Sequence, residues 1–332
     1  MKVLITANFT PEGIRELEEL GIEVIYEPWT RRNRVLLSDE LAERIVATGA
    51  KAVILESDLC HGEVFEAAKL KFIGCCRCDP LVVDLDCANA SRTPVFFTPG
   101  RNAEAVADLT VALMIDLLRQ VIPAANAVRS GDFNPETPAD YIEALQRFSG
   151  PELGSRVVGI IGLGSVGSAV ARRLLAFGSA LLVHDPFAPD ERLRAFNARR
   201  VGLSELFRLS DLVTLHAAER EENGGMITAD LIGAMKPSAY FLNLARASLV
   251  DNGALYRALA DYRIAGAALD VFSREPVSTD DPLVKLPNVI ALPHLGGASP
   301  DVVRHQSEMI VASVRSWLKG KKPRHCVNPE VI

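Results

Sequence analysis

The sequence contains no apolar run that approaches the roughly 20 residues a membrane-spanning helix requires. It also has no block of like charges, no low-complexity segment and no repeat of fixed period, and its formal net charge is −6 over 332 residues. These absences argue against bulk attraction to nucleic acid or to an anionic membrane. No apolar signal segment precedes the first strand pattern, so we expect a cytoplasmic protein.

Cysteine is infrequent, with six residues in the chain. The cluster Cys75-Cys76-Arg77-Cys78 has no second C-x-x-C pair to complete a metal site, and neighbouring strand residues point to opposite faces of a sheet. We therefore expect buried strand thiols and no metal. Disulfides are disfavoured in a cytoplasmic chain. The six residues are Cys60, Cys75, Cys76, Cys78, Cys87 and Cys326.

The most informative segment that is present lies near the middle of the chain. An apolar strand pattern at 157–161 runs into Gly162-x-Gly164-x-x-Gly167, a helical pattern follows, and a second strand pattern ends at Asp185. In a dinucleotide site the first glycine permits a tight turn, the second admits the pyrophosphate, and the third lets helix pack on strand. Amides of the helix N-terminus would bind phosphate. Asp185 would accept a hydrogen bond from a ribose 2′-OH and repel a 2′-phosphate, which favours NAD over NADP.

The first hundred residues alternate short apolar segments with amphipathic ones. This alternation predicts parallel β-α-β units with right-handed connections. The strand candidates are 2–6, 22–27, 51–56, 71–76 and 94–98, and helices are expected between them near 12–20, 39–48, 62–69 and 84–91.

The second part of the chain begins with a long helical pattern after Asn102. The segment 131–155 is rich in proline and glycine, which is typical of a loop or arm. The β-α alternation resumes from 156 to 295, and a helix is expected at Pro300–Leu318. The strands of this part are expected at 157–161, 180–185, 212–216, 239–244, 264–270 and 289–292.

These patterns predict an α/β protein of two Rossmann-like or flavodoxin-like domains, each a doubly wound parallel sheet, with a cleft between them. Two domains are the natural expectation at 332 residues. The glycine fingerprint places the dinucleotide-binding domain at 102–301, in which 102–150 forms a long helix and arm. The substrate domain is expected to be discontinuous, at 1–101 and 302–332, because the last helix should return to the first unit.

Chemically active side chains follow successive strands of the dinucleotide domain, at the edge where open α/β sheets bind ligands. Arg246 follows one strand, Asp270 and then Glu275 follow the next, and His294 follows the last. An arginine can bind a carboxylate and polarise the adjacent carbonyl, and a histidine can transfer a proton near neutral pH. A carboxylate beside the histidine favours its charged form. The set suits hydride chemistry on an anionic carbonyl compound, although each residue alone also fits a surface ion pair, a loop charge or a strand-capping histidine.

Together, the fingerprint, Arg246, Asp270, Glu275-Pro276 and Pro293-His294-x-Gly296-Gly297 resemble the D-isomer-specific 2-hydroxyacid dehydrogenases, in particular the D-3-phosphoglycerate dehydrogenase branch. The likeness extends over nearly the whole chain. It implies that Arg246 binds the substrate carboxylate and carbonyl oxygen, and that His294, oriented by Glu275, gives and takes the proton. It also implies a homodimer, with the long helix and arm in the interface.

The resemblance also implies a set of NAD contacts. The amides of Ser165 and Val166 would meet the pyrophosphate, the backbone of Leu244 and Ala245 would line the cofactor, and Asp270 would lie by the nicotinamide carboxamide. The complete expected set is Gly162, Gly164, Ser165, Val166, Gly167, Asp185, Leu244, Ala245, Asp270 and Gly296.

The substrate loop departs from the family pattern. This loop is usually glycine-rich, so that its amides bind the substrate carboxylate, but here it contains Arg77, Asp79 and Pro80. Pro80 has no amide hydrogen, and Asp79 would repel an anionic substrate. Arg77 could supply a second substrate-binding cation, for a phosphate or a second carboxylate. An equally good alternative is that Arg77 pairs with Asp79 or Asp84 and clamps the loop.

The leading interpretation is an NAD-dependent oxidoreductase that interconverts a small D-2-hydroxy acid and its 2-oxo acid, of the phosphoglycerate dehydrogenase type. One alternative is a glyoxylate or hydroxypyruvate reductase. Another is a non-catalytic NAD(H)-sensing protein on the same scaffold, which the lack of basic or low-complexity interaction segments disfavours.

Overall fold

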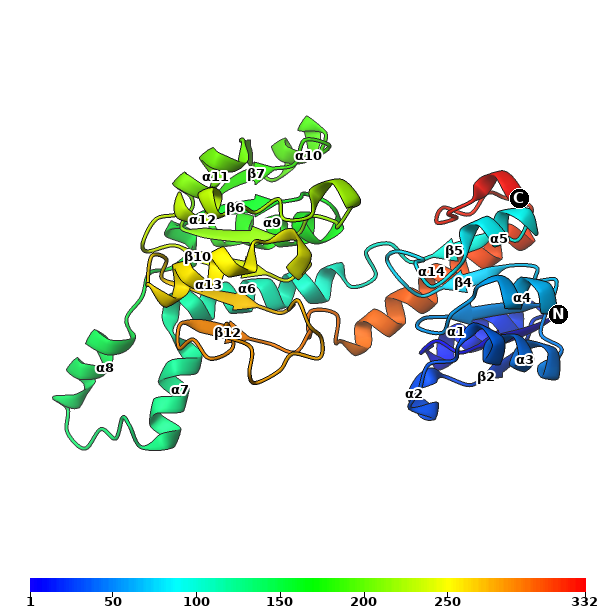
Figure 1. Cartoon of the computed structure of the whole chain (residues 1–332), viewed down its shortest axis with the longest axis horizontal. Coiled ribbons are helices and arrows are strands. Elements are labelled where there is room, and N and C mark those ends of the chain that lie inside the picture. Colours follow the sequence, from blue (N-terminus) through cyan, green and yellow to red (C-terminus); the bar gives the residue numbers. More distant parts are fainter. The chain divides into compact units, whose positions relative to one another are not determined.

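The computed structural model describes all residues from Met1 to Ile332. The chain divides into two compact units, which are described separately (Figure 1). Unit 1 comprises Met1–Asn102 and Ser299–Ile332, and unit 2 comprises Ala103–Ala298. The chain therefore leaves unit 1 after its fifth strand and returns to it with a single long helix.

Unit 1 is built on a five-stranded parallel sheet with the strand order β2-β1-β3-β4-β5. Local sequence signals define its helices: Thr10 accepts a hydrogen bond from Gly13 at the start of α1, and Asp84 accepts one from Cys87 at the start of α5. The elements are β1 (Lys2–Ile5), α1 (Pro11–Glu19), β2 (Glu23–Tyr26), α2 (Trp29–Arg32), α3 (Ser38–Thr48), β3 (Ala52–Leu55), α4 (Gly62–Ala67), β4 (Ile73–Cys75), α5 (Leu85–Ala90), β5 (Val95–Phe97), α14 (Pro300–Leu318) and η4 (Pro329–Val331).

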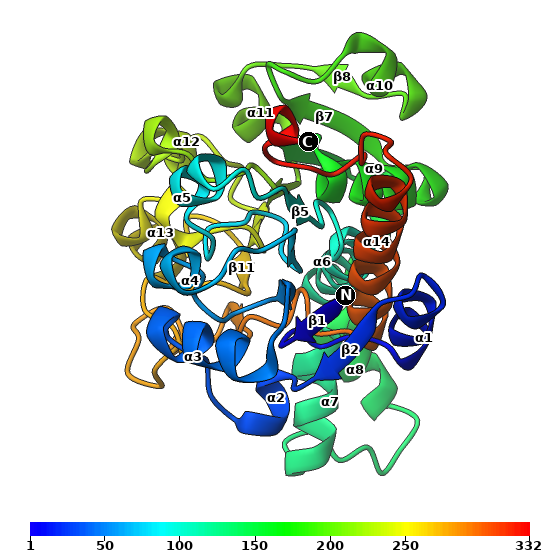
Figure 2. The same ribbon diagram turned by 90° about the vertical axis from the view of Figure 1, so that its right-hand side faces the viewer.

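Helices cover both faces of this sheet, with α3 and α4 on one face and α1 and α14 on the other (Figure 2). The returning helix α14 buries Ile310 and Val314 in a core shared with β1 and β3. Gly74 permits this approach, because a Cβ there would lie 3.2 Å from Ile310. Neither α14 nor any other helix is long and apolar enough to cross a membrane.

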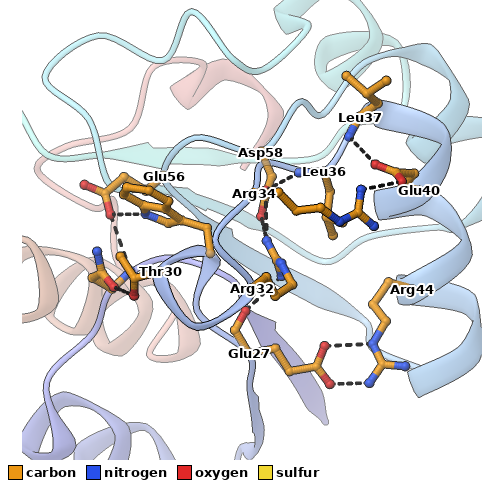
Figure 3. A network of polar contacts seen from close by, with 12 residues as sticks. Glu27, Thr30, Arg32, Arg34, Leu36, Leu37, Glu40, Arg44, Glu56 and Asp58 are labelled. Atoms are coloured by element: carbon orange, nitrogen blue, oxygen red, sulfur yellow. Dashed lines mark hydrogen bonds and ion pairs between the residues drawn. The ribbon is translucent and has the colours of Figure 1, made fainter.

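Acidic side chains at the end of β3 anchor the segment that follows β2 (Figure 3). The Asp58 carboxylate is 0% exposed and accepts hydrogen bonds from Arg32 at 2.8 and 2.9 Å and from the Leu36 amide at 2.7 Å. Glu56 accepts one from Trp29 Nε1 at 3.2 Å and one from Arg101 at 2.8 Å. These buried charges are paired, as burial in a low-dielectric interior requires.

Unit 2 is built on a seven-stranded parallel sheet with the order β12-β11-β10-β9-β6-β7-β8. The order reverses next to β6, which is the position where such sheets bind ligands. The elements are α6 (Ala103–Arg119), α7 (Val121–Ser130), α8 (Asp140–Phe148), η1 (Leu153–Ser155), β6 (Val157–Ile161), α9 (Ser165–Phe177), β7 (Ala180–His184), α10 (Asp190–Ala195), β8 (Arg199–Arg200), α11 (Leu203–Leu209), β9 (Leu212–Leu215), η2 (Glu221–Asn223), α12 (Ala229–Gly233), β10 (Tyr240–Asn243), η3 (Ala247–Leu249), α13 (Asn252–Ala260), β11 (Gly266–Leu269) and β12 (Val289–Ala291).

Two hydrophobic cores sandwich this sheet. Ile160 contributes to the core under α6 and α9, whereas its neighbour Ile161 contributes to the core under α11, α12 and α13. This division follows from the alternation of side chains along a strand. Unit 2 is thus a three-layer arrangement in which the carboxyl ends of the strands form one edge.

The predicted fold class is confirmed, because both sheets are parallel and carry helices on both faces. The long helical pattern predicted after Asn102 is present as α6, which ends at Arg119. The helix breaks there because Gln120 has φ 51°, and Asp116 accepts a hydrogen bond from the Ile122 amide at the start of α7. The prediction of a loop at 131–155 misses α8, an amphipathic helix. The short elements α2 and β8 were also not predicted, since neither carries an apolar period.

The prediction of buried strand thiols is confirmed for Cys75 and Cys76 and wrong for Cys78, which is exposed. Burial raises the pKa of Cys75 to about 12, so this thiol stays protonated. All six cysteines are free thiols.

Candidate active site

The three glycines of the fingerprint have different structural roles in the turn between β6 and α9. Gly162 has φ 88°, and a Cβ there would lie 2.7 Å from the Ala217 amide nitrogen. A Cβ on Gly167 would collide with the carbonyl oxygen of Gly162. Gly164, however, has φ −72° and would have no neighbour within 4 Å of an added Cβ. The protein itself requires glycine at 162 and 167, whereas the space at Gly164 is free for a ligand.

The helix that follows supplies donors at this space. Helix α9 begins at Ser165 without a side-chain cap, and its first intrahelical bond runs from the Ser168 amide to the Gly164 carbonyl. The preceding amides, including those of Ser165 and Val166, belong to the first turn, where amides lack intrahelical acceptors and the dipole attracts anions. The free space and these amides fit the pyrophosphate of a dinucleotide.

Asp185 lies directly beyond β7 and faces the same turn. Its carboxylate accepts hydrogen bonds from the Leu163 amide at 2.7 Å, the Phe187 amide at 2.9 Å and the Ala188 amide at 3.0 Å. These bonds join the glycine turn to the end of β7. Asp185 is therefore a structural brace of the cofactor loop as well as the predicted ribose ligand.

At the end of β10, an asparagine shapes the turn that presents Arg246. Asn243 donates to the Arg246 carbonyl at 2.9 Å and accepts from the Ala245 amide at 3.0 Å. The Arg246 side chain is 54% exposed, donates through Nη1 to the Ala245 carbonyl at 2.7 Å, and has its Nε 3.8 Å from Glu219. No protein acceptor is bonded to its Nη2. Arg246 is thus available to an anionic ligand.

Asp270, at the end of β11, is buried and braces the loop beyond β12. It is 1% exposed, and its two oxygens accept hydrogen bonds from the Leu295 and Gly296 amides at 2.7 Å each. Burial raises the pKa of Asp270, against the opposing effect of the two amide bonds. A Cβ on Gly296 would lie 3.0 Å from this carboxylate, which explains the glycine there. The expected contact of Asp270 with nicotinamide stays a prediction.

His294 and Glu275 form a close pair at this edge. His294 Nδ1 lies 2.7 Å from Glu275 Oε2, while the other Glu275 oxygen accepts a hydrogen bond from the Phe272 amide at 3.2 Å. Partial burial works to raise the pKa of Glu275, but the bonds from His294 and Phe272 and the nearby Arg246 charge outweigh it, so the pKa lies below its ordinary value. The histidine is 50% exposed, and its Nε2 has no protein partner. The pair can therefore deliver or accept a proton at Nε2.

In unit 1, Arg77 follows β4, and its side chain makes only one weak contact. Its Nη1 lies 3.5 Å from the Glu56 carbonyl oxygen, and it forms no ion pair with a carboxylate. The alternative of a clamp with Asp79 or Asp84 is wrong, because Asp84 instead caps α5 through the Cys87 amide. Arg77 is left as a cation without an acidic partner.

Unit 2 thus brings together all the predicted site residues outside Arg77: the glycine turn, Asp185 and the strand-end residues lie on elements of one sheet. Sequence reasoning missed Asn243 and Glu219 as site residues. Asn243 could have been found, since it precedes Leu244-Ala245-Arg246 at a strand end. Glu219 could not, because it lies in an irregular loop with no spacing that links it to Arg246.

A doubly wound sheet with a dinucleotide turn, an accessible arginine and a histidine–carboxylate pair defines a dinucleotide-dependent oxidoreductase. Residues 111–296 match the model of the D-isomer specific 2-hydroxyacid dehydrogenase NAD-binding domain. A Bacillus subtilis protein named as a candidate 2-hydroxyacid dehydrogenase is 37% identical over 97% of this chain and 92% of its own length. The chain belongs to the D-isomer-specific 2-hydroxyacid dehydrogenase family, and it is an NAD-dependent oxidoreductase.

Further relatives carry more specific names. A glyoxylate reductase of Korarchaeum cryptofilum is 32% identical over 100% of this chain and 97% of its own length. A D-3-phosphoglycerate dehydrogenase of Archaeoglobus fulgidus is 31% identical over 99% of this chain, which spans 59% of that protein. The crystal structure of the TT0316 protein from Thermus thermophilus has a TM-score of 0.82 and 32% identity, and the match covers 98% of this chain and 100% of that one.

The different roles of the glycines yield a matched pair of variants. Gly164→Ala should fold with unchanged thermal stability but bind NADH at least about tenfold more weakly, because its methyl group would occupy the space meant for pyrophosphate. Gly167→Ala should lower the stability by about 2 kcal/mol or more, since its Cβ collides with the Gly162 carbonyl. Thermal melts and NADH fluorescence titrations measure both effects. Wild-type NADH affinity in Gly164→Ala would contradict the assignment.

Proposed function

We propose that this protein catalyses the reversible reduction of a small 2-oxo acid to a D-2-hydroxy acid, with Arg246, Glu275 and His294 as its catalytic residues. The observation that carries the proposal is the 2.7 Å contact between His294 Nδ1 and Glu275, which leaves Nε2 free on the sheet edge that also bears Arg246 and the glycine turn. When bound, NADH supplies the hydride for the carbonyl carbon, and NAD accepts it in the oxidation.

The arginine binds and activates the substrate. A guanidinium can bind a carboxylate through two parallel hydrogen bonds and polarise the adjacent carbonyl, which makes its carbon more electrophilic. The Nη1 bond to the Ala245 carbonyl fixes the plane of the Arg246 side chain, and Nη2 remains available for the substrate. Arg246 therefore contacts the reacting groups directly.

The histidine moves the proton. In the reduction, His294 Nε2 donates a proton to the carbonyl oxygen as the hydroxyl forms, and in the oxidation Nε2 takes that proton back. Glu275 holds Nδ1 at 2.7 Å and thereby orients the ring. The His294–Glu275 pair thus serves as the acid in the reduction and as the base in the oxidation.

Arg77 supplies a further cation to the anionic part of the substrate. In the family pattern this loop binds the substrate through backbone amides, and Pro80 removes one of them. Arg77 has no carboxylate partner in unit 1, so its charge is available. We accordingly assign unit 1 to substrate recognition and unit 2 to NAD. The names of the relatives leave phosphoglycerate-type, glyoxylate and hydroxypyruvate-type substrates as the candidates.

The test of the reaction class is oxidation of NADH, followed at the nicotinamide absorbance band. The panel contains glyoxylate, pyruvate, hydroxypyruvate, 2-oxoglutarate and 3-phosphohydroxypyruvate, with NADPH as a parallel cofactor. We expect turnover of at least one of these acids with NADH. Tight NADH binding without turnover of any of them would contradict the proposal.

Removal of the proton carrier should abolish turnover but not cofactor binding. For His294→Ala we expect a loss of kcat of about 10²–10⁴-fold, the range attributed to general acid–base catalysis. The dissociation constant for NADH should stay within about twofold, because no predicted cofactor contact involves this ring. His61→Ala, which alters an exposed histidine of unit 1, serves as the control. Loss of NADH binding in His294→Ala would instead make the histidine a structural residue.

We infer further that the protein forms a homodimer through the arm, defined here as residues 121–148. Its helices α7 and α8 expose large apolar side chains that no other part of the chain covers. An apolar surface of this kind marks an interaction site, and a second copy of the same arm is a self-complementary partner. The exposed fractions are 51% for Val121, 44% for Ile122, 60% for Val128, 66% for Tyr141, 60% for Ile142 and 67% for Leu145.

Charges placed on the arm should separate the dimer. The double variant Ile142→Glu/Leu145→Glu should elute as a monomer, since burial of two carboxylates in an apolar interface is strongly unfavourable. Gln146→Glu, at an exposed polar position of the same helix, is the matched control and should leave the mass unchanged. Size-exclusion chromatography with light scattering measures the mass. A wild-type protein that is monomeric at micromolar concentration would refute the inference.

A further inference from the structure

A carboxylate lies beside the proposed substrate-binding arginine. Glu219 belongs to the loop that follows β9, and its Oε2 is 3.8 Å from Arg246 Nε. Its other oxygen accepts a hydrogen bond from the Ser248 hydroxyl at the start of the segment after Arg246. The position of the Glu219 carboxylate is therefore fixed relative to the guanidinium.

The contact between Glu219 and Arg246 contributes little to the free energy of folding. The two side chains are 48% and 54% exposed, and the 3.8 Å separation exceeds hydrogen-bond length. Exposed ion pairs of this kind are weak stabilisers, because water screens them and two long side chains must be ordered. Glu219 nevertheless differs from its neighbours, because Glu221 and Glu222 in the same loop form no ion pair.

The orientation of the arginine leaves space for a ligand beside Glu219. Nη1 donates to the Ala245 carbonyl, Nε faces Glu219, and Nη2 has no protein partner. One substrate carboxylate can bind the guanidinium through Nη2, and Glu219 offsets part of the same single positive charge from the Nε side. A second anionic group near this position would meet the Glu219 carboxylate and be repelled. A hydroxyl group could instead donate a hydrogen bond to it.

We propose that Glu219 determines substrate specificity: it rejects a second anionic group and accepts a hydrogen bond from a hydroxyl, so the substrate is a singly charged 2-oxo acid with a neutral, hydroxylated end. This inference rests on the proposed function, because it requires that Arg246 binds the substrate carboxylate. It separates hydroxypyruvate-type substrates from phosphorylated ones and from dicarboxylates.

The kinetic test uses two substrates that differ only in a phosphate, hydroxypyruvate and 3-phosphohydroxypyruvate. Wild-type kcat/KM with NADH should favour hydroxypyruvate by at least about tenfold. Glu219→Gln keeps the size of the side chain and an acceptor for Ser248, and it should reduce this preference by at least about fivefold. The change should arise mainly from a lower KM for the phosphorylated substrate, with kcat nearly constant. Glu222→Gln removes an unpaired carboxylate from the same loop and should leave the preference unchanged.

A binding measurement tests the same residue without turnover. Oxamate and oxalate have nearly the same shape, but oxalate carries one more negative charge. Titrated into the enzyme–NADH complex and followed by nicotinamide fluorescence, oxalate should gain affinity relative to oxamate in Glu219→Gln and not in Glu222→Gln. The ratio of the two affinities separates a charge effect from a general loss of structure, which would weaken both ligands.

The outcomes are distinguishable from those of the proposed function. An unchanged substrate preference and an unchanged oxalate-to-oxamate ratio in Glu219→Gln would overturn the specificity role, as would an equal change in Glu222→Gln. A wild-type preference for the phosphorylated substrate would also overturn it and would leave the dehydrogenase assignment intact. Failure of the dehydrogenase assignment would appear as NADH binding without turnover of any of the five acids of the panel.

Discussion

The geometry of the candidate site depends on one buried carboxylate. Asp270 accepts the amides of Leu295 and Gly296, the two residues that directly follow His294. His294 has φ 58°, a backbone conformation that costs free energy for any residue other than glycine. The two amide bonds hold the loop in this turn, and the turn directs the imidazole toward Glu275. Without the two amide bonds to Asp270, the backbone turn that directs the His294 ring toward Glu275 would lose its support.

The two acidic residues at this edge, Asp270 and Glu275, differ in how far their side chains are exposed. Asp270 is 1% exposed, and both of its oxygens are engaged by backbone amides, so it acts on the backbone. The Glu275 side chain is 38% exposed and divides its two oxygens between the Phe272 amide and the His294 ring. Glu275 thus connects the loop that follows β11 to the half-exposed ring of His294. In the reaction that we propose, preorganisation of this kind lowers the free-energy cost of aligning the reacting groups.

The residues of the glycine pattern and those that follow strand ends could be predicted from the sequence, whereas Glu219, in the loop after β9, could not. Gly162, Gly164, Gly167 and Asp185 form a strand–turn–helix–strand pattern, which the parallel sheet order confirms. The hydrogen bonds that these residues make could not be predicted from the sequence. That Asp185 bonds to the amide of Leu163, within the glycine turn, depends on tertiary geometry that no periodicity encodes.

The errors have equally specific causes. Arg77 and Asp84 are close in sequence, which favoured an ion pair, but Asp84 is engaged as the cap of α5. The break between α6 and α7 lies in a continuous helical pattern, because the left-handed Gln120 and the Asp116 cap are visible only in the backbone.

The three glycines of the turn differ in whether the fold itself requires them. Gly162 and Gly167 are explained by the protein alone, because a Cβ at either position would collide with backbone atoms. Gly164 is not explained in this way, since its φ suits any residue and the space around an added Cβ is empty. A side chain there would cost the fold nothing and would obstruct only a molecule that approaches the N-terminus of α9. The absence of a side chain at Gly164 therefore fits the position that we propose for the NAD pyrophosphate, at the N-terminus of α9.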